Sequence, residues 1–251
     1  MRVLARSGYA VLGIVHIVVG AVALSAATGA GGGEADQSGA MSQISRSPGG
    51  DVLLWLMAIG LFALTLWQVV QVVLVRDDDG KKKWGKRGSE ASKGVAYLVL
   101  GVSSVVFAAG GHQSSQHSTE SFSATMLATP GGAFVIVLVG LITLGIGIGF
   151  GVLGLTTKFE KQVRMPRQPF DTVVRVIGVA GYVAKGVALA IVGVLFVVAA
   201  VTNDARQAGG LDSALKSLRT LPFGEVLLWL AGLGLILYGV YCGIRAVLAK
   251  M

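Results

Sequence analysis

Long apolar stretches alternate with short polar ones along the chain, and six of the apolar stretches are long enough to cross a membrane. About 20 residues of α-helix, at a rise of about 1.5 Å each, span the roughly 30 Å of a bilayer's hydrocarbon core. The pattern therefore predicts a polytopic, all-α membrane protein. The predicted transmembrane helices cover residues 4–27, 52–75, 94–110, 133–156, 176–201 and 225–248.

The stretches between these helices differ in kind. Residues 28–50 and 111–132 are polar and rich in glycine or serine, which predicts loops. Residues 76–93 and 158–175 are charged connectors that hold most of the basic residues. Residues 211–221 carry leucines at helical spacing among charged residues, which predicts a short amphipathic helix on the membrane surface.

One two-helix hairpin is repeated three times. The second helix of each copy follows a proline and glycines, at Pro48, Pro130 and Pro222, and the first helix carries glycines at matching positions. The repetition predicts a bundle of three homologous hairpins about a pseudo-three-fold axis along the membrane normal. The three hairpin repeats, with their connectors, are assigned to residues 1–75, 76–157 and 158–251.

The repeat also decides between two interpretations of residues 1–27. Two arginines, an apolar stretch and small residues are typical of a cleaved signal peptide. The glycine spacing of this stretch returns within residues 181–193, however, where a signal peptide cannot lie. We therefore expect residues 4–27 to be a retained first span.

The repeated pattern resembles a known family. Each copy has a glycine or serine, then a second glycine, then a third glycine seven residues later, and finally Pro-x-Gly. This is similar to the domain-of-unknown-function family 1206, found mostly in actinobacterial membrane proteins as three tandem two-helix units. The basic residue typical of that family before the second glycine is present as Lys93 and Lys185 but is replaced by Leu12. The resemblance, over residues 4–74, 92–154 and 177–248, implies six helices and brings no catalytic residues.

Charge gives the predicted orientation. Only 14% of the residues are charged, against about 25% in soluble domains, and the mean hydropathy is +0.73. The net charge of +8 does not indicate nucleic acid, because the basic residues lie in short connectors between spans. Of 21 Lys and Arg residues, 17 lie on the side of the termini and charged connectors and four in the Pro-Gly loops. We expect a multi-pass protein of the cell membrane with both termini in the cytoplasm.

Glycine inside the apolar stretches predicts close helix packing. The chain has 37 glycines, and most lie within the predicted spans, where small residues let two helix backbones approach. A leucine at Gly147 or Gly151 is expected to push such backbones apart. The predicted helix-packing residues are Gly13, Gly20, Gly94, Gly101, Gly147, Gly151, Gly186 and Gly193.

Polar side chains near the cytoplasmic ends of three spans have two interpretations. They could line a shallow polar cup open to the cytoplasm, or they could form the interfacial belt of aromatic and snorkelling side chains that membrane bundles carry. The candidate residues of the cup are His16, Gln68, Gln71, Tyr238, Tyr241 and Arg245.

The sequence predicts no catalytic residue, cofactor or metal site. The single cysteine, Cys242, excludes an internal disulfide, and no second strong ligand lies at the depth of His16 to hold a haem or a metal. Asp77, Asp78 and Asp79 are followed at once by lysines, which favours a solvated loop over a Mg²⁺ site. We therefore expect a protein that is not an enzyme.

Two functions are weighed. The leading prediction is a structural or accessory protein that packs against membrane lipids or other membrane protein subunits. Glycine-lined helices are abundant in the chain, and acid–base residues inside the membrane are scarce. The alternative is a small transporter or channel with a pathway along the pseudo-three-fold axis, a geometry that some transporters use.

Overall fold

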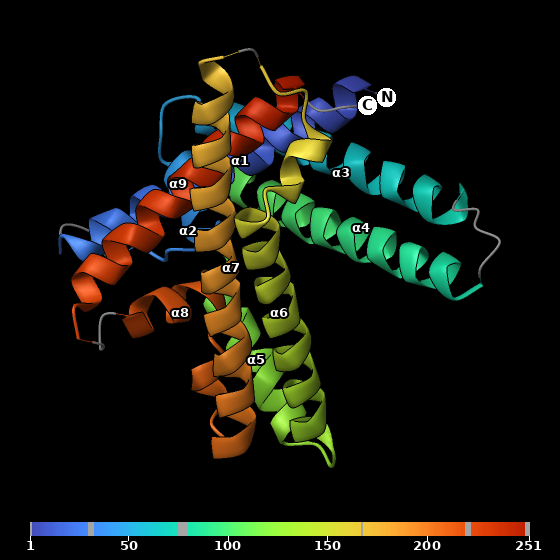
Figure 1. Cartoon of the computed structure of the whole chain (residues 1–251). Helices are drawn as coiled ribbons and strands as arrows, with labels where there is room; N and C mark the ends of the chain where they lie inside the picture. Colours follow the sequence, from blue (N-terminus) through green and yellow to red (C-terminus); the bar gives the residue numbers. More distant parts are fainter. Residues whose placement is uncertain (1, 30–32, 75–79, 167, 219–221, 249–251) are drawn as a thin grey trace. The chain divides into compact units, whose positions relative to one another are not determined.

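The computed structural model describes residues 2–29, 33–74, 80–166, 168–218 and 222–248, and these residues are mainly helical (Figure 1). The helices are α1 (Arg2–Ala27), α2 (Gln37–Ser45), α3 (Gly50–Leu74), α4 (Gly80–Ala108), α5 (Ser115–Leu127), α6 (Gly132–Leu155), η1 (Lys158–Gln162), α7 (Phe170–Thr202), η2 (Ala205–Ala208), α8 (Gly210–Leu218) and α9 (Gly224–Leu248). The labels η1 and η2 denote short 3₁₀ helices.

Six helices in the described part of the chain are long and apolar enough to cross a membrane. Their apolar stretches are Gly8–Ala27, Gly50–Leu74, Lys83–Ala108, Gly132–Leu155, Phe170–Thr202 and Gly224–Leu248. These helices confirm the predicted fold class: the protein is all-α, with six candidate spans in three repeats, and its long helices pack in pairs. The protein is therefore an integral membrane protein.

Two stretches predicted to be loops contain helices. Residues 28–50 include α2, and residues 111–132 include α5. The backbone N–H of His117 donates a hydrogen bond of 3.0 Å to Ser114 Oγ, which satisfies one of the free donors at the start of α5. Serine-rich composition predicted a loop because serine favours caps and turns, yet here one serine caps a helix.

The charged connectors are also partly helical. α4 begins at Gly80, so most of the basic residues of the first connector lie on a helix, and α7 begins at Phe170, before the end of the second connector. Lysine, arginine and alanine are good helix formers, which lets a span continue beyond its apolar stretch. The predicted solvated loop at residues 77–79 lies outside the described residues.

The chain forms two compact units. Unit 1 contains residues 1–11 and 41–113, and unit 2 contains residues 12–40 and 114–251. In unit 1, α3 and α4 run side by side, as their extensive contacts show (Figure 1). In unit 2, α7 packs along α6 and also crosses α9. Unit 2 contains the pocket and the buried side-chain cluster described below.

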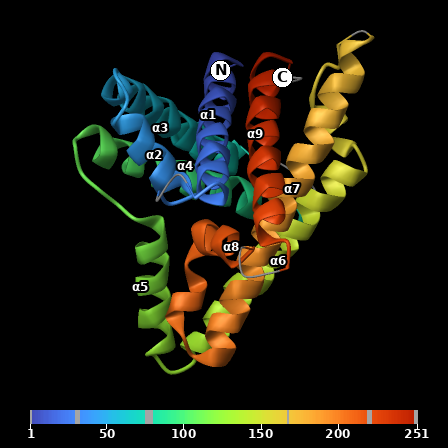
Figure 2. The ribbon, with the colours of Figure 1, turned by 90° about the vertical axis from the view of Figure 1, so that its left-hand side faces the viewer.

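In the described residues, three close helix pairs join different repeats. The second span of the first repeat, α3, packs on the first span of the second repeat, α4, and α6 packs on α7 in the same way. The last repeat pairs with the first one, because α9 lies against α1 in unit 2 (Figure 2). Each repeat therefore gives one helix to each of two such pairs.

Glycines make these pairs close. A Cβ atom added to Gly147 of α6 would lie 2.5 Å from the backbone nitrogen of Ala190, and one added to Gly193 of α7 would lie 2.7 Å from the carbonyl oxygen of Gly140. Real side chains do not approach a backbone so closely, so both positions require glycine. The backbone of Gly151 lies under Gly186, but a Cβ on Gly151 itself would meet open space.

The other two helix pairs also have glycines at their contacts, but the helices approach each other more closely in one pair than in the other. On α1, a Cβ added to Gly13 or to Gly20 would lie 2.8 or 2.5 Å from a carbonyl oxygen of α9, belonging to Gly239 or Gly232. On α4, a Cβ added to Gly101 would meet only side-chain atoms of α3, at 3.3 Å or more. The α3–α4 pair is therefore the least tightly fitted at these positions.

The short amphipathic helix expected at residues 211–221 is α8, and one of its residues is placed differently from the prediction. Leu215 and Leu218 are buried as expected. Asp212, predicted on the polar side, is also completely buried. Its Oδ1 accepts the backbone N–H of Ala35 at 2.8 Å, and its Oδ2 lies 2.5 Å from Lys216 Nζ. A buried carboxylate is tolerated because both of its oxygens have partners.

Candidate functional site

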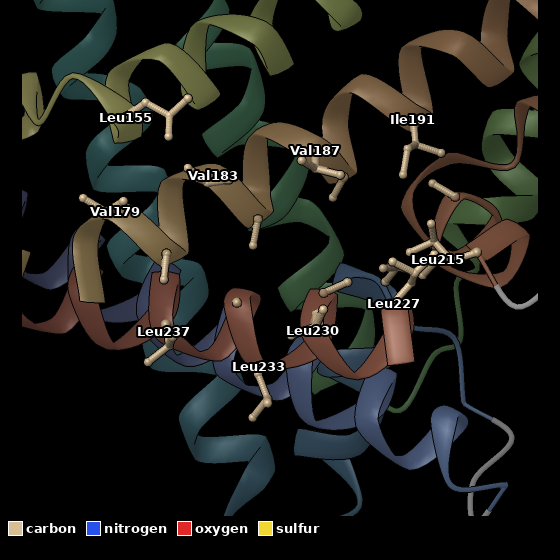
Figure 3. Close-up of a pocket in the computed structure, with 17 residues that line it drawn as sticks. Leu155, Val179, Val183, Val187, Ile191, Leu215, Leu227, Leu230, Leu233 and Leu237 are labelled. Carbon is tan, nitrogen blue, oxygen red and sulfur yellow. The ribbon is translucent and has the colours of Figure 1, made fainter. Parts of the chain in front are cut away.

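The candidate site is an apolar groove of unit 2 between α7 and α9 (Figure 3). Its volume is about 610 Å³, within the range of about 300–1,000 Å³ that is typical of ligand pockets. Every residue that lines it is Leu, Val, Ile, Ala or Gly. The groove lies within two helices that are long and apolar enough to cross a membrane.

Two stripes of side chains shape the groove. Val179, Val183, Val187 and Ile191 recur every four residues along α7, and this spacing places them on one face of the helix as a wall. Leu227, Leu230, Leu233 and Leu237 line the groove from α9 (Figure 3).

Small residues form the floor between the two helices. Ala180, Ala184 and Ala188 of α7 line the groove at another four-residue spacing, and Gly234 lines it from α9. A Cβ added to Gly234 would collide with the methyl group of Ala184, so the α9 backbone lies directly against that methyl group. The floor is therefore shallow and fixed, whereas the larger side chains stand on either side of it.

The two ends of the groove differ. At one end, Leu215 and Leu218 of α8 line it beside Leu227, and Figure 3 shows Leu215 there near Ile191. At the other end lie Leu155, Val179 and Leu237, close to the C-terminus of α6 and the charged connector.

A buried aromatic cluster lies in the same half of unit 2 as the connector. Tyr182 stands at its centre, with its ring centroid 5.2 Å from that of Phe159, 5.4 Å from Tyr238 and 5.3 Å from Tyr241. Phe159 belongs to η1, so the cluster fixes the charged connector to the ends of α7 and α9. Such ring pairs are each worth about 0.5–1.5 kcal/mol beyond the area that they bury.

Lys185 brings a positive charge to this cluster. Its Nζ lies 4.1 Å from the ring centroid of Tyr238 and 5.0 Å from that of Phe150, which is cation–π geometry. Among the side chains that the structure describes, no carboxylate pairs with Lys185 Nζ. An ionisable residue within a span marks a functional region by default, and here aromatic faces take the place of a counter-ion.

The residues of the predicted polar cup lie in both units. His16 packs edge-on against Tyr238, with ring centroids 4.8 Å apart, and its Nδ1 lies 2.8 Å from the carbonyl oxygen of Leu12, which indicates a donated N–H. Tyr241 is in the aromatic cluster, and Arg245 Nη1 donates a 3.4 Å hydrogen bond to Tyr182 Oη. These four cup residues, with Tyr238 among them, belong to unit 2.

The two glutamines of the cup belong to unit 1. Gln68 is buried, and its Nε2 donates to the backbone oxygen and to Oε2 of Glu90, at 3.1 and 2.6 Å. Gln71 is only partly buried. Lys93 also binds Glu90, through Nζ to Oε1 at 2.6 Å, so the basic residue of the second repeat has a carboxylate partner.

Sequence reasoning missed Tyr182, Phe150 and Lys185 as members of the cluster. Lys185 had a usable signal, because a lysine inside an apolar stretch is costly and needs a reason. The aromatic residues had none, because their meeting depends on how α6, α7 and α9 cross. The apolar groove had none either, because valine and alanine stripes are typical of any packed span.

A polar network holds the segments outside the spans together in unit 2. Asp36 caps α2 by accepting the backbone N–H of Gly39 at 2.9 Å. Ser114 Oγ donates to Glu34 Oε1 at 2.6 Å, and the hydroxyls of Ser38 and Ser115 are hydrogen-bonded to each other. Burial is the main reason that the pKa of Asp36 rises from 3.8 to about 6, and the nearby carboxylates of Glu34 and Asp212 also raise it.

These acidic groups do not form a metal centre. In the described ranges, no group of three or more His, Cys, Asp or Glu side chains is placed to hold a metal ion. The network has a structural role, because its hydrogen bonds join the segments around α2, α5 and α8. Each of its carboxylates accepts a hydrogen bond, either from another segment or from the N-terminus of α2.

Comparison with known proteins identifies the repeats. The family model of the Domain of Unknown Function DUF1206 matches residues 7–74, 90–157 and 180–249. The chain belongs to the DUF1206 family. Each match covers one repeat, so the pairs α3–α4, α6–α7 and α1–α9 in this DUF1206 protein each join two family repeats, whereas α7 and α9 pack within one repeat.

A curated relative extends over nearly the whole chain. It is a protein of Bacillus subtilis (strain 168) with the name "Uncharacterized protein YxxB", 31% identical over 258 residues. The alignment covers 98% of this chain and 90% of the relative. No solved structure matches. The DUF1206 repeats therefore support the six-span architecture, and function has to be argued from the groove and the cluster.

Proposed function

We propose that the protein is an accessory membrane protein that packs against lipids, and that the groove between α7 and α9 holds a lipid hydrocarbon chain. The supporting observation is the groove itself: it is wholly apolar, about 610 Å³ in volume, and lies within two spans. The α7 wall runs from Val179 to Ile191, about 18 Å at 1.5 Å per residue. That length is more than half of a hydrocarbon core of about 30 Å.

The proposal assigns no reaction to the chain. It also places the protein in the cell membrane with both termini in the cytoplasm, and the supporting observation is the 17-to-4 division of basic residues. On this orientation the connector end of the groove faces the inner leaflet. A helix of another membrane subunit is the other occupant that the apolar lining would suit.

The direct test is to fill the groove. Val187 stands in the middle of the α7 wall and is 53% exposed, so Val187→Trp adds bulk to the groove without entering the core. Val194, also on α7 and 47% exposed, does not line the groove, so Val194→Trp is the matched control. Lipids that stay bound through purification are counted by native mass spectrometry.

We expect the wild type and Val194→Trp to retain lipid and Val187→Trp to lose most of it. Equal lipid retention by all three would contradict the proposal. If another protein copurifies in stoichiometric amount with the wild type and Val194→Trp but not with Val187→Trp, and no lipid is retained, the groove would be assigned to a partner subunit instead.

A transporter is the second candidate, and Lys185 is the observation that favours it. This lysine lies in a span beside Tyr238 and His16, without a carboxylate partner among the described side chains. If the cluster moved protons, the wild type in vesicles should collapse an imposed pH gradient, and His16→Leu should fold but lose that activity. We expect no proton movement by the wild type, and we expect His16→Leu to change the stability of the protein very little.

A further inference from the structure

The lipid that suits the groove is set by the charge at its connector end. On α7, Arg175 precedes Val179 by one turn, so it continues the same helix face as the groove wall. Helical side chains also lean towards the N-terminus of their helix, which carries the Arg175 guanidinium away from the apolar groove and towards the membrane surface. Arg175 is half exposed, with 49% of its side-chain surface accessible.

The guanidinium of Arg175 has N–H donors that its ion pair with Glu160 does not use. Its Nε lies 2.6 Å from Glu160 Oε1, which holds the guanidinium in place. A guanidinium has five N–H donors in a planar fork, and the pair with Glu160 through Nε occupies only one of them. A planar fork of this kind suits phosphate, which accepts two parallel hydrogen bonds.

The surrounding connector adds positive charge at the same end. η1 is anchored by Phe159, and the backbone N–H of Arg164 donates to the carbonyl oxygen of Leu248 at 2.7 Å, which ties the connector to the end of α9. Lys158 and Arg164 are exposed there. Among the described side chains of the connector and the start of α7, three are basic and two, Glu160 and Asp171, are acidic, so this end of the groove carries a net positive charge.

We propose that the occupant of the groove is an anionic phospholipid, with one acyl chain between α7 and α9 and its phosphate at Arg175. This inference rests on the proposed function and adds the class of head group. The lining leaves an acyl chain no polar partner, so the chain alone cannot select among lipids. Selectivity must come from the cationic end, where a basic residue near the surface favours an anionic lipid by about fivefold.

The test measures head-group preference at constant chain length. Delipidated protein is incubated in mixed micelles with equal amounts of dioleoyl phosphatidylglycerol and dioleoyl phosphatidylcholine, and bound lipid is counted by native mass spectrometry. We expect the wild type to be enriched in the anionic lipid, and Arg175→Gln to lose about fivefold of that enrichment while binding a similar total. Arg206→Gln is the matched control, because Arg206 is an exposed arginine, likewise paired to a carboxylate, far along the chain from the groove end.

Two further measurements keep the test decisive. Arg175→Lys retains the charge but not the planar fork, so it should retain more of the preference than Arg175→Gln and less than the wild type. Raising the salt from 0.1 to 1 M shortens the screening length from about 10 to about 3 Å, so the preference of the wild type for the anionic lipid should fall. This measurement does not depend on whether Arg175→Gln folds correctly. Equal binding of both lipids by the wild type, or a preference that neither Arg175→Gln nor salt reduces, would overturn the inference.

The outcomes also separate this inference from the proposed function. If Val187→Trp binds as much lipid as the wild type, the groove is not the binding site and both proposals fail. If Val187→Trp loses lipid but head-group preference is absent, the groove binds chains and only the role of Arg175 is wrong.

Discussion

Asp36 is a carboxylate whose surroundings oppose its charge. It is 2% exposed, and the carboxylates of Glu34 and Asp212 lie nearby. Its pKa in the folded protein, about 6, is above the ordinary value of 3.8. The folded state therefore binds the proton more tightly than the unfolded chain does. It follows that Asp36 costs no stability below pH 4, and that the cost grows as the pH rises from about 4 to about 6.

Asp36→Asn should remove this dependence. Asparagine keeps the cap on α2, because its side-chain oxygen can also accept the N–H of Gly39. Above pH 6 the variant should be more stable than the wild type by about 1–3 kcal/mol, since each unit of pKa shift corresponds to 1.36 kcal/mol. Thermal melting in detergent, followed by circular dichroism at pH 4, 5, 6 and 7.5, measures the difference.

The control for this prediction is another carboxylate outside the spans. Asp204 is bound by Arg206 through two oxygens, and that arginine lowers its pKa instead of raising it. Asp204→Asn should therefore show no gain of stability above pH 6. A stability difference between Asp36→Asn and the wild type that stays constant from pH 4 to 7.5 would contradict the account of Asp36.

At the scale of single residues, the sequence indicated which side chains are polar, but it did not indicate which residues surround them. The polar character of His16, Tyr238, Tyr241 and Arg245 was visible in the chain, and the structure brings these four into one unit. The role of Tyr182 as the centre of the cluster was not visible, because its neighbours come from helices far apart in sequence. The burial of Asp212 was hidden for the same reason, since its partner Ala35 is 177 residues away.

At the scale of helices, the α6–α7 pair depends on glycine at particular positions. A side chain at Gly147 would meet the backbone of α7, whereas one at Gly151 would meet open space. We therefore expect Gly147→Leu to destabilise the protein by about 1–3 kcal/mol, the usual cost of overpacking, and Gly151→Leu to cost much less. This differs from the expectation drawn from the sequence, which treated the two glycines alike.

Melting temperatures in one detergent, under identical conditions, compare these variants. Gly149→Leu provides a second control, because a Cβ at Gly149 also has nothing within 4 Å. A similar loss of stability in all three variants would mean that the contact with α7 does not set the effect, because the higher helix propensity of leucine favours stability at each position. An unchanged melting temperature for Gly147→Leu would contradict the pairing of α6 with α7.

The helices themselves were largely predictable, and their pairing was not. Apolar length alone located all six spans, because a bilayer demands it. The short helices α2 and α5 were missed, because their stability comes from caps and tertiary contacts and not from an apolar pattern. The repeat drew attention to hairpins, but the second and third glycines of the repeated motif fit a helix of another repeat, a choice that periodicity does not encode.

At the scale of the whole molecule, the orientation is tested by surface labelling. In a Cys242→Ser background, a cysteine replacing the exposed Thr129 should react with an impermeant thiol reagent in intact cells. A cysteine replacing the exposed Lys158 should react only after the membrane is opened. The reason is the excess of basic residues on the side of Lys158. The opposite labelling pattern would show that both termini lie outside.

The occupant of the groove is tested most directly by photo-crosslinking in vesicles. A phospholipid with a diazirine in its acyl chain is activated by light, and the modified residues are mapped by mass spectrometry. The exposed face of α6 around Phe134, Leu138 and Leu141 is equally apolar but does not line the groove, so it serves as an internal reference. The account predicts adducts concentrated on residues 179–191 and 227–237, and lost from them in Val187→Trp. Adducts spread over α6, α7 and α9 in proportion to exposure, and unchanged in Val187→Trp, would contradict it.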